Sequence, residues 1–200
     1  IMAVSVLAIN YTIGLIIGAV VGYYGGILDL LFERLVEIIT SIPFLSVLML
    51  LTLRFGSSMW VVVIAFTATG WIGPYGTGRM QFYRFKNREY VLAARTLGAS
   101  DRRIMFKHIF PNTLGLIITG MALSIPRFVF TESTYAFLNI IKYSNATSVG
   151  MLIQQGQNNM KDFPHLILFP SLYIATLMIS FNLFGNGLRD AFNPSLRGVE

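Results

Sequence analysis

The stretch NREYVLAARTLGASDRRIMFKHIFPN, residues 87–112, decides the fold because it is a charged break between two long apolar runs. Asn87 can cap a helix, and Glu89 suits the positive N-terminal end of that helix. The paired small residues Ala93 and Ala94 let a short helix settle into a groove of another protein without side chains holding it off. The first half of the stretch therefore predicts a short helix that carries small residues.

The second half of the same stretch predicts a turn and a second helix. Gly98 tolerates the left-handed conformation that ends many helices. Ser100 and Asp101 favour a new helix start, and Pro111 can open the membrane span that follows. Apolar side chains such as Ile104 can anchor this basic, amphipathic helix at the membrane or in a partner protein. We therefore expect two short helices joined at a glycine hinge.

The apolar runs on both sides of this break are long enough to cross a membrane. Of 200 residues, 54% are hydrophobic and only 12% are charged, about half the charged share of a soluble domain. A crossing helix needs about 20 mostly apolar residues. Five segments qualify, namely Ile1–Leu28, Ile27–Leu53, Phe55–Gly78, His108–Pro126 and Phe163–Leu188. The sequence therefore predicts an all-α, polytopic transmembrane helix bundle that forms one domain over residues 1–200.

The distribution of Lys and Arg predicts the orientation of these spans, because cytoplasmic flanks retain positive charge. With five alternating spans, eleven of the fifteen basic residues fall on one side, three fall on the other, and Arg127 lies within a span. The richer side, with a loop at about residues 79–111 and a tail at residues 189–200, is predicted to be cytoplasmic. A loop at about residues 139–162 then lies outside. Since the chain begins at Ile1 inside an apolar run, we expect an N-terminal truncation and six spans in the full-length protein.

Glycines in the first span predict close helix packing. Gly14, Gly18 and Gly22 recur every four residues and so lie on one helix face, where a neighbouring backbone can approach.

Charged residues in the second span form a pattern of their own. Asp29, Glu33 and Glu37 are four residues apart and share one helix face at the cytoplasmic entry, where Arg34 can pair with one of them. Packing near the interface is one interpretation of this cluster, and a contribution of Glu33 and Glu37 to a solute pathway is the other.

The fourth span also contains ionisable residues in its second half. Arg127 and Glu132 can face a pathway, pair with each other or lie near the outer interface. Their separation of five residues is not ideal for a pair on one helix.

Residues 87–112 resemble the EAA motif of bacterial ABC importer permeases, which has two alanines, a glycine four residues later and a closing proline. More narrowly, EYVLAARTLGAS followed by HIFPN is similar to the oligopeptide/dipeptide permease subfamily and to its C-type member. Residues 22–45 and 181–198 resemble the second-to-third-span region and the C-terminus of the same family. The chain departs from the pattern at Leu92, where the family usually has an acid, and at Asn193, where an aspartate is common.

The resemblance implies a permease subunit of the bacterial inner membrane that imports di- or oligopeptides, with nickel or another small solute as the alternative cargo. It implies four partners: a second homologous permease chain, two cytoplasmic ATP-binding subunits and an extracytoplasmic solute-binding protein. It also implies that the cytoplasmic loop couples the ATPase to the spans. The expected coupling residues are Glu89, Ala93, Ala94, Gly98, Ala99, Ser100, Asp101, Arg102 and Ile104. Residues 154–159 of the outer loop either dock the binding protein or are merely solvated.

Several absences from the sequence narrow the function. There is no Gly-Lys dipeptide, so we expect no phosphate-binding P-loop on this chain, and the energy must come from a partner or an ion gradient. The resemblance implies ATP and Mg²⁺ on partner subunits and no cofactor on this chain. There is no cysteine, no HExxH motif and no serine nucleophile elbow, so neither a metal site nor an enzyme is expected. The basic excess follows membrane topology, and no nucleic-acid partner is expected. An ion-coupled secondary transporter fits the composition as an alternative, although such proteins usually show internal repeats.

Overall fold

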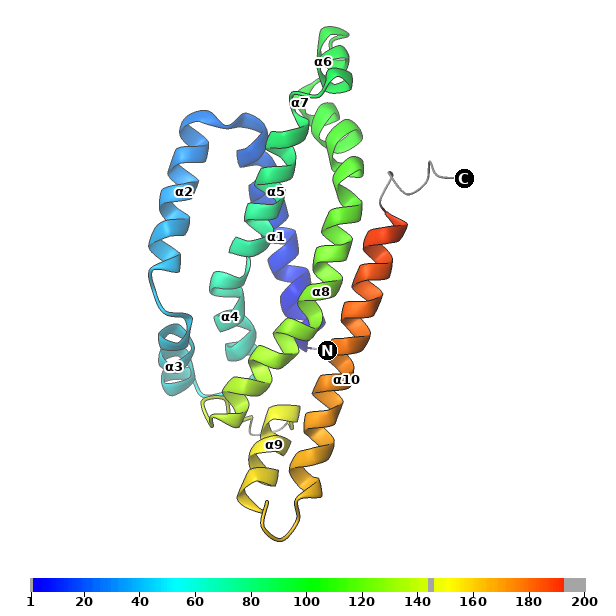
Figure 1. The fold of residues 1–200 in the computed structure, drawn as a ribbon. Helices are drawn as coiled ribbons and strands as arrows, with labels where there is room; N and C mark the ends of the chain where they lie inside the picture. The colour runs from blue at the N-terminus through cyan, green and yellow to red at the C-terminus, as the bar shows by residue number, and fades with distance from the viewer. Residues whose placement is uncertain (1, 144–145, 193–200) are drawn as a thin grey trace.

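A computed structural model describes residues 2–143 and 146–192, and every regular element in these ranges is helical. Along the chain the elements are α1 (Met2–Tyr24), α2 (Gly26–Thr40), α3 (Phe44–Phe55), α4 (Met59–Gly70), α5 (Ile72–Phe85), α6 (Glu89–Thr96), α7 (Asp101–Arg103), the π-helical turn η1 (Ile104–Ile109), α8 (Phe110–Phe137), α9 (Val149–Asn158) and α10 (His165–Ala191). The long helices run side by side as an elongated bundle (Figure 1). The all-α prediction is confirmed.

Five spans are present when the bent pair α2–α3 is counted as one. The described residues contain four helices that are long and apolar enough to cross a membrane, and α2 and α3 add a broken fifth span with a bend of 67°. Pro43 accounts for the break, because it has no N–H to donate and its ring disfavours helical geometry at Ile42. At this end of α2 the Ser41 backbone N–H and hydroxyl both donate to the Glu37 carbonyl, at 3.0 and 2.7 Å.

The third and fourth spans differ from their predicted limits. The third begins at Met59, because Gly56 has a φ of 78° and the Ser58 hydroxyl accepts a hydrogen bond from the Val61 N–H. It continues to Phe85, seven residues beyond the predicted end. The fourth span runs through Pro126 to the end of α8, because a proline is tolerated in a helix packed against neighbours.

The glycines of α1 pack against α5, as predicted. A Cβ atom at each position would overlap a backbone carbonyl oxygen of α5 or of its N-cap residue. The pairs are Gly14 with Trp71, Gly18 with Tyr75, and Gly22 with Arg79. Both helices therefore meet backbone to backbone over two turns, and any side chain larger than hydrogen would separate them.

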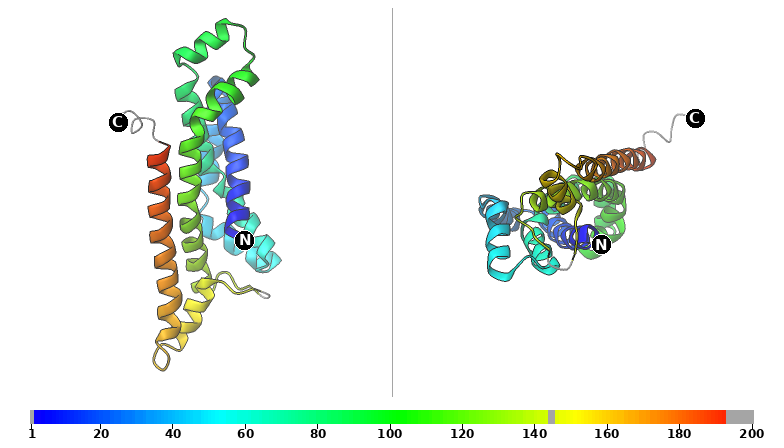
Figure 2. Two further views of the ribbon diagram at one scale, coloured as in Figure 1. Left: turned by 90° about the vertical axis from the view of Figure 1, so that its right-hand side faces the viewer. Right: turned by 90° about the horizontal axis from the view of Figure 1, so that it is seen from below.

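The two ends of the bundle carry different structures. Helix α6 projects beyond the spans at the end predicted to be cytoplasmic, and α9 lies at the opposite end (Figures 1 and 2). The loop at about residues 139–162 contains the short helix α9, capped by the Ser148 hydroxyl, which accepts from the Met151 N–H at 3.3 Å. It is packed between α8 and α10, because Gly150 lies against the Ser133 backbone and Gly156 against the Leu166 backbone. Most of the predicted tail, residues 193–200 with Asn193, lies outside the described residues.

Candidate functional site

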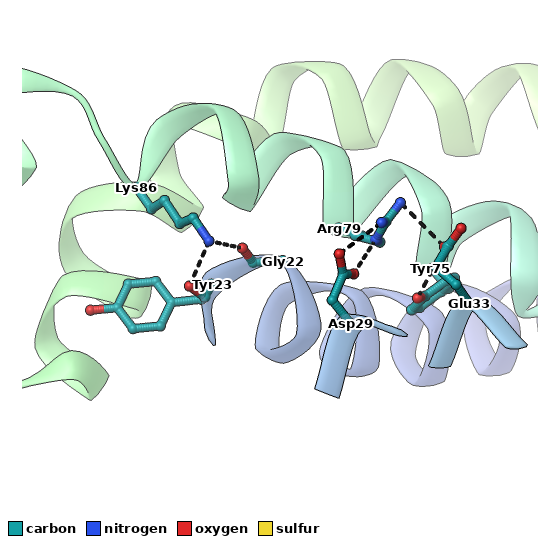
Figure 3. Close-up of polar contacts among 7 residues, drawn as sticks. All are labelled: Gly22, Tyr23, Asp29, Glu33, Tyr75, Arg79 and Lys86. Carbon is teal, nitrogen blue, oxygen red and sulfur yellow. Dashed lines mark hydrogen bonds and ion pairs between the residues drawn. The ribbon is translucent and has the colours of Figure 1, made fainter. Parts of the chain in front are cut away.

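The candidate site is the loop between α5 and η1, residues 86–103, which is predicted to be cytoplasmic and which we call the coupling loop. It is shorter than the predicted range of 79–111, because the flanking residues belong to helices α5, η1 and α8. Its first residue fixes it to α1. Lys86 Nζ donates to the carbonyl oxygens of Gly22 and Tyr23 at 3.0 and 3.1 Å (Figure 3). These carbonyls end α1, where a cation is favoured by the helix dipole.

Helix α6 begins and ends by local interactions. Its N-cap is Arg88, without a capping hydrogen bond from the side chain, so the prediction that Asn87 caps this helix is wrong. Its C-terminus follows the prediction. Gly98 has a φ of 80°, the Gly98 N–H donates to Arg95 O at 3.0 Å, and the Ala99 N–H donates to Ala94 O at 3.0 Å. This is the paired pattern of a Schellman motif. A Cβ at Gly98 would meet nothing within 4 Å, so glycine is needed here for its backbone angle.

Tyr23, the penultimate residue of α1, is the point where the coupling loop is held. Its hydroxyl donates to Asp101 Oδ1 at 2.5 Å and accepts from Arg95 Nη2 at 3.1 Å. The Ser100 hydroxyl caps α7 by accepting from the Arg103 N–H at 3.4 Å, as predicted for this helix start. One side chain of α1 thus binds both halves of the loop.

An apolar cluster lies beneath the coupling loop. Its buried members come from four elements and are Tyr23, Phe82, Val91, Ile104, Met105 and Ile109. Ile104 is fully buried in this cluster. The prediction that Ile104 anchors the second helix at the membrane or in a partner is therefore wrong. An apolar position on an amphipathic helix has the same sequence pattern whether it is covered by its own chain or by another.

The second helix of the loop is continuous with the fourth span, contrary to the prediction of a separate short helix. Helix α7, the turn η1 and α8 follow one another without a break from Asp101 to Phe137. Pro111 has no N–H and cannot continue the regular ladder, and the helix widens to π geometry just before it. The Phe110 N–H accordingly donates to Met105 O, five residues back. The loop therefore joins the span directly.

The remaining predicted coupling residues lie at the surface of the loop. Exposed are Glu89, Ala93, Gly98, Ser100, Asp101 and Arg102, and partly buried are Ala94 and Ala99. Two apolar neighbours are also exposed, Leu92 at 44% and Leu97 at 88%. Leu92, Ala93 and Thr96 lie on one face of α6, because residues three and four apart stack, and Leu97 follows at its C-terminal end. This face is turned away from the buried Val91.

The acidic face of α2 binds a residue that the sequence analysis missed. Arg79 of α5 donates from Nε and Nη2 to the Asp29 carboxylate at 2.5 and 2.9 Å, and its Nη1 lies 3.2 Å from Glu33 Oε1 (Figure 3). The Tyr75 hydroxyl lies 3.5 Å from the same Glu33 oxygen. The expected contact of Arg34 is with Glu37 at 2.6 Å, and both side chains are largely exposed. Arg79 is 50 positions from Asp29, so no local spacing reveals the pair.

The structure separates the two ionisable residues of the fourth span. The ion pairs found in the described ranges join Arg34 to Glu37 and Arg79 to Asp29 and Glu33, so Arg127 and Glu132 are not paired with each other. Arg127 is exposed, whereas Glu132 is 6% exposed near the outer end of α8. A pathway role for these two residues, and for Glu33 and Glu37, stays a prediction.

Comparison with protein families assigns the chain. Residues 14–198 match the family described as the binding-protein-dependent transport system inner membrane component. The chain belongs to this family. With its apolar helices, membership makes it a multi-pass protein of the bacterial cytoplasmic membrane.

Curated members of this family confirm the resemblance to peptide permeases. The chain is 37% identical to the dipeptide transport system permease protein DppC of Bacillus subtilis over 190 residues, which are 94% of the chain and 59% of that protein. It is 38% identical to the oligopeptide transport system permease protein OppC of Haemophilus influenzae over 189 residues, 94% of the chain and 61% of that protein. The chain thus spans about three fifths of the length of these relatives.

A solved structure shows the same fold. A chain from the inward-facing conformations of the MetNI methionine ABC transporter superposes with a TM-score of 0.74 at 17% identity, covering 96% of this chain and 91% of the other. At that identity the likeness concerns the fold, which is that of an ABC transporter membrane chain.

Proposed function

We propose that this chain is the membrane-spanning permease subunit of an ATP-driven ABC importer of peptides. In this proposal it forms the translocation pathway with a second homologous permease chain. Two cytoplasmic subunits bind ATP and Mg²⁺, and an extracytoplasmic binding protein delivers the solute. No cofactor is assigned to the chain itself. The observation that carries the proposal is a loop, predicted to be cytoplasmic, that is tied to α1 and to the fourth span and still exposes the apolar side chains of Leu92 and Leu97.

The exposed face of α6 is suited to a protein partner. Leu97, the C-cap residue of α6, is 88% exposed, and Leu92 and Ala93 of the same helix are also exposed. Burying one leucine side chain on a partner is worth about 2 kcal/mol. The small Ala93 lets the helix approach a groove closely. The proposed partner is an ATP-binding subunit.

The attachments of the loop explain how such a contact would reach the spans. Lys86 and Tyr23 tie it to α1, and the continuous helix from Asp101 ties it to the fourth span. A displacement of α6 is therefore passed to α1 and α8 together. A partner can shift the bundle between two states only through contacts whose free energy differs between those states. Because the loop is tied to both α1 and the fourth span, a displacement of the loop moves both helices.

Peptides are the proposed cargo because relatives carry names that refer to them. The permeases DppC and OppC of Bacillus subtilis are named for dipeptide and oligopeptide transport and are 37% and 36% identical to the chain. Membership in a binding-protein-dependent family also favours ATP-driven import over the ion-coupled alternative.

The test compares two substitutions at Leu97 in the full-length chain assembled with its partner subunits in proteoliposomes. Leu97→Asp places a charge at the proposed contact without disturbing internal packing, so we expect loss of co-purifying ATP-binding subunits and at least a 10-fold drop in ATP-dependent dipeptide uptake. Leu97→Met keeps an apolar side chain of similar volume and should retain both the co-purifying ATP-binding subunits and dipeptide uptake. Full assembly and uptake by Leu97→Asp would remove the coupling loop from the proposal.

A further inference from the structure

Glu132 is a buried carboxylate that forms no ion pair within the described residues. It lies on α8, is 6% exposed, and its Oε1 atom has no hydrogen-bond partner among residues 2–143 and 146–192. A carboxylate removed from water needs a counter-charge or several donors, because its transfer to an apolar environment is unfavourable by several kcal/mol. Such a group inside a membrane protein marks a functional site by default.

The carboxylate lines a cleft of about 440 Å³ at the outer end of the bundle. This volume falls within the range of small-molecule sites, roughly 300–1,000 Å³. The walls come from α1, α4, α8 and the segment before α9, and they are mainly apolar. The residues used below are Met2, Phe128, Val129, Glu132, Tyr143 and Ser148. No Lys, Arg or His of the described ranges lines the cleft.

The polar neighbours of Glu132 are neutral. The Ser148 hydroxyl lies beside the carboxylate and also caps α9. The Tyr143 hydroxyl donates to Met2 Sδ at 3.3 Å. Burial, and then the negative charge of Glu132, raise the pKa of the Tyr143 phenol, so it stays uncharged at neutral pH. The cleft therefore contains one acidic group, neutral hydroxyls and the aromatic rings of Phe128 and Tyr143.

We propose that this cleft is a subsite for a primary ammonium group, the free amino terminus of the transported peptide. A carboxylate accepts hydrogen bonds from an ammonium group and neutralises its charge, and aromatic rings also favour a cation. The position fits a solute that arrives from outside, because Ser148 and Val149 of the lining stand at the start of α9, which lies at the end of the bundle opposite α6 (Figure 1). The inference rests on the proposed peptide cargo. The other source of a primary ammonium group is the headgroup of phosphatidylethanolamine.

A cysteine placed in the cleft tests this subsite directly, since residues 1–200 contain no cysteine. Val129→Cys, in the full-length chain within its complex, is modified by a small water-soluble maleimide in phosphatidylglycerol nanodiscs. L-alanyl-L-alanine should slow the modification at least 5-fold, and N-acetyl-L-alanyl-L-alanine, which lacks the ammonium group, should not. Equal protection by both compounds, or by neither, overturns the proposal.

Variants at Glu132 assign the effect to the carboxylate. In the Val129→Cys background, Glu132→Gln should raise the dialanine concentration needed for protection about 10-fold, whereas Glu132→Asp keeps the charge and should retain protection. Thr134→Ala is the matched control, because it removes a hydroxyl on the same helix that donates to Phe130 O and does not line the cleft. Retained protection in Glu132→Gln overturns the proposal. Should Glu132→Gln fail to assemble, the comparison of free and acetylated dialanine in the parent protein decides.

Two further arms separate the alternatives. In one arm, phosphatidylethanolamine is added to the nanodisc. If the cysteine is modified slowly only when this lipid is present, and dialanine does not change the rate, the subsite binds lipid and the peptide assignment is overturned. ATP-dependent dialanine uptake by the wild-type complex is measured in parallel. Uptake without protection rejects the subsite alone, whereas absence of uptake rejects the peptide cargo itself.

Discussion

Helix α5 holds α1 and α2 by opposite kinds of contact. Against α1 it packs through the glycines at 14, 18 and 22, with backbone touching backbone. Against α2 it is joined by the ion pairs of Arg79 and by a stacked ring pair, Phe32 with Tyr75, whose centroids are 6.2 Å apart. Helix α2 has no buried residue, whereas α1 has eight. One neighbour is fixed by shape and the other by charge.

This difference indicates which parts can move. Close packing between α1 and α5 has no alternative register at low energy, so the pair forms a rigid spine. Helix α2 is bounded by glycines with positive φ at residues 25 and 26 and by the break at Pro43. A helix with flexible ends and a few polar contacts can change position when those contacts exchange. The coupling loop is attached to the spine, so we expect a displacement of the loop to move α1 and α5 together.

Gly18→Ala is expected to produce the largest effect, because it breaks the spine. Its Cβ would overlap the Tyr75 carbonyl and lie 2.8 Å from the Arg79 backbone nitrogen, so the helices must separate. We expect a loss of about 3 kcal/mol of stability, measured as a lower melting temperature and poor yield of monodisperse protein. Gly76→Ala is the matched control on α5, where a Cβ meets nothing within 4 Å and helix propensity predicts a gain of up to about 1 kcal/mol. Equal losses in both variants would refute the spine.

Arg79→Gln should have an intermediate effect, because it releases α2 while the spine stays intact. The substitution leaves Asp29, one quarter exposed, without its bidentate partner. We expect a cost of about 2 kcal/mol, which is below that of a fully buried pair, and a broader distance distribution between spin labels on Ile38→Cys and Met80→Cys. The control Arg34→Gln removes a largely exposed pair and should cost less than about 0.5 kcal/mol. An unchanged distance distribution in Arg79→Gln would show that α2 is held by other contacts.

Features predicted well from the sequence are those set by near neighbours. The left-handed glycine at 98, the cap at Ser100 and the packing face of Gly14, Gly18 and Gly22 each depend on residues within one or two helical turns. The number of spans follows from hydropathy, which averages over whole segments, whereas the orientation inferred from charge stays a prediction. Such local patterns can be interpreted without knowing which distant segment of the chain the residues contact.

Features missed are those whose partner lies far along the chain. Asp29 pairs with Arg79 and Tyr23 with Asp101, at separations of 50 and 78 residues. Ile104 was predicted to contact another molecule and is buried in its own chain, because amphipathicity does not identify what covers the apolar face. The position of Glu132 beside the segment before α9 could not be predicted either, because no short sequence pattern relates the two.

Tyr23→Phe should have the smallest effect on stability and the most specific one, because it tests only the attachment of the coupling loop to the spine. The ring stays in the apolar cluster, while the hydroxyl contacts with Asp101 and Arg95 are lost, at about 1.4 kcal/mol. Melting of the bundle should hardly change, whereas amide hydrogen exchange in residues 89–104 should accelerate about 10-fold. Tyr24→Phe is the neighbouring control, on a side chain that is 57% exposed, and should leave exchange unaltered. If exchange in the loop stays slow without the Tyr23 hydroxyl, then Lys86 and the buried cluster are sufficient to hold the loop, and its motion is coupled to α1 by packing instead of by polar contacts.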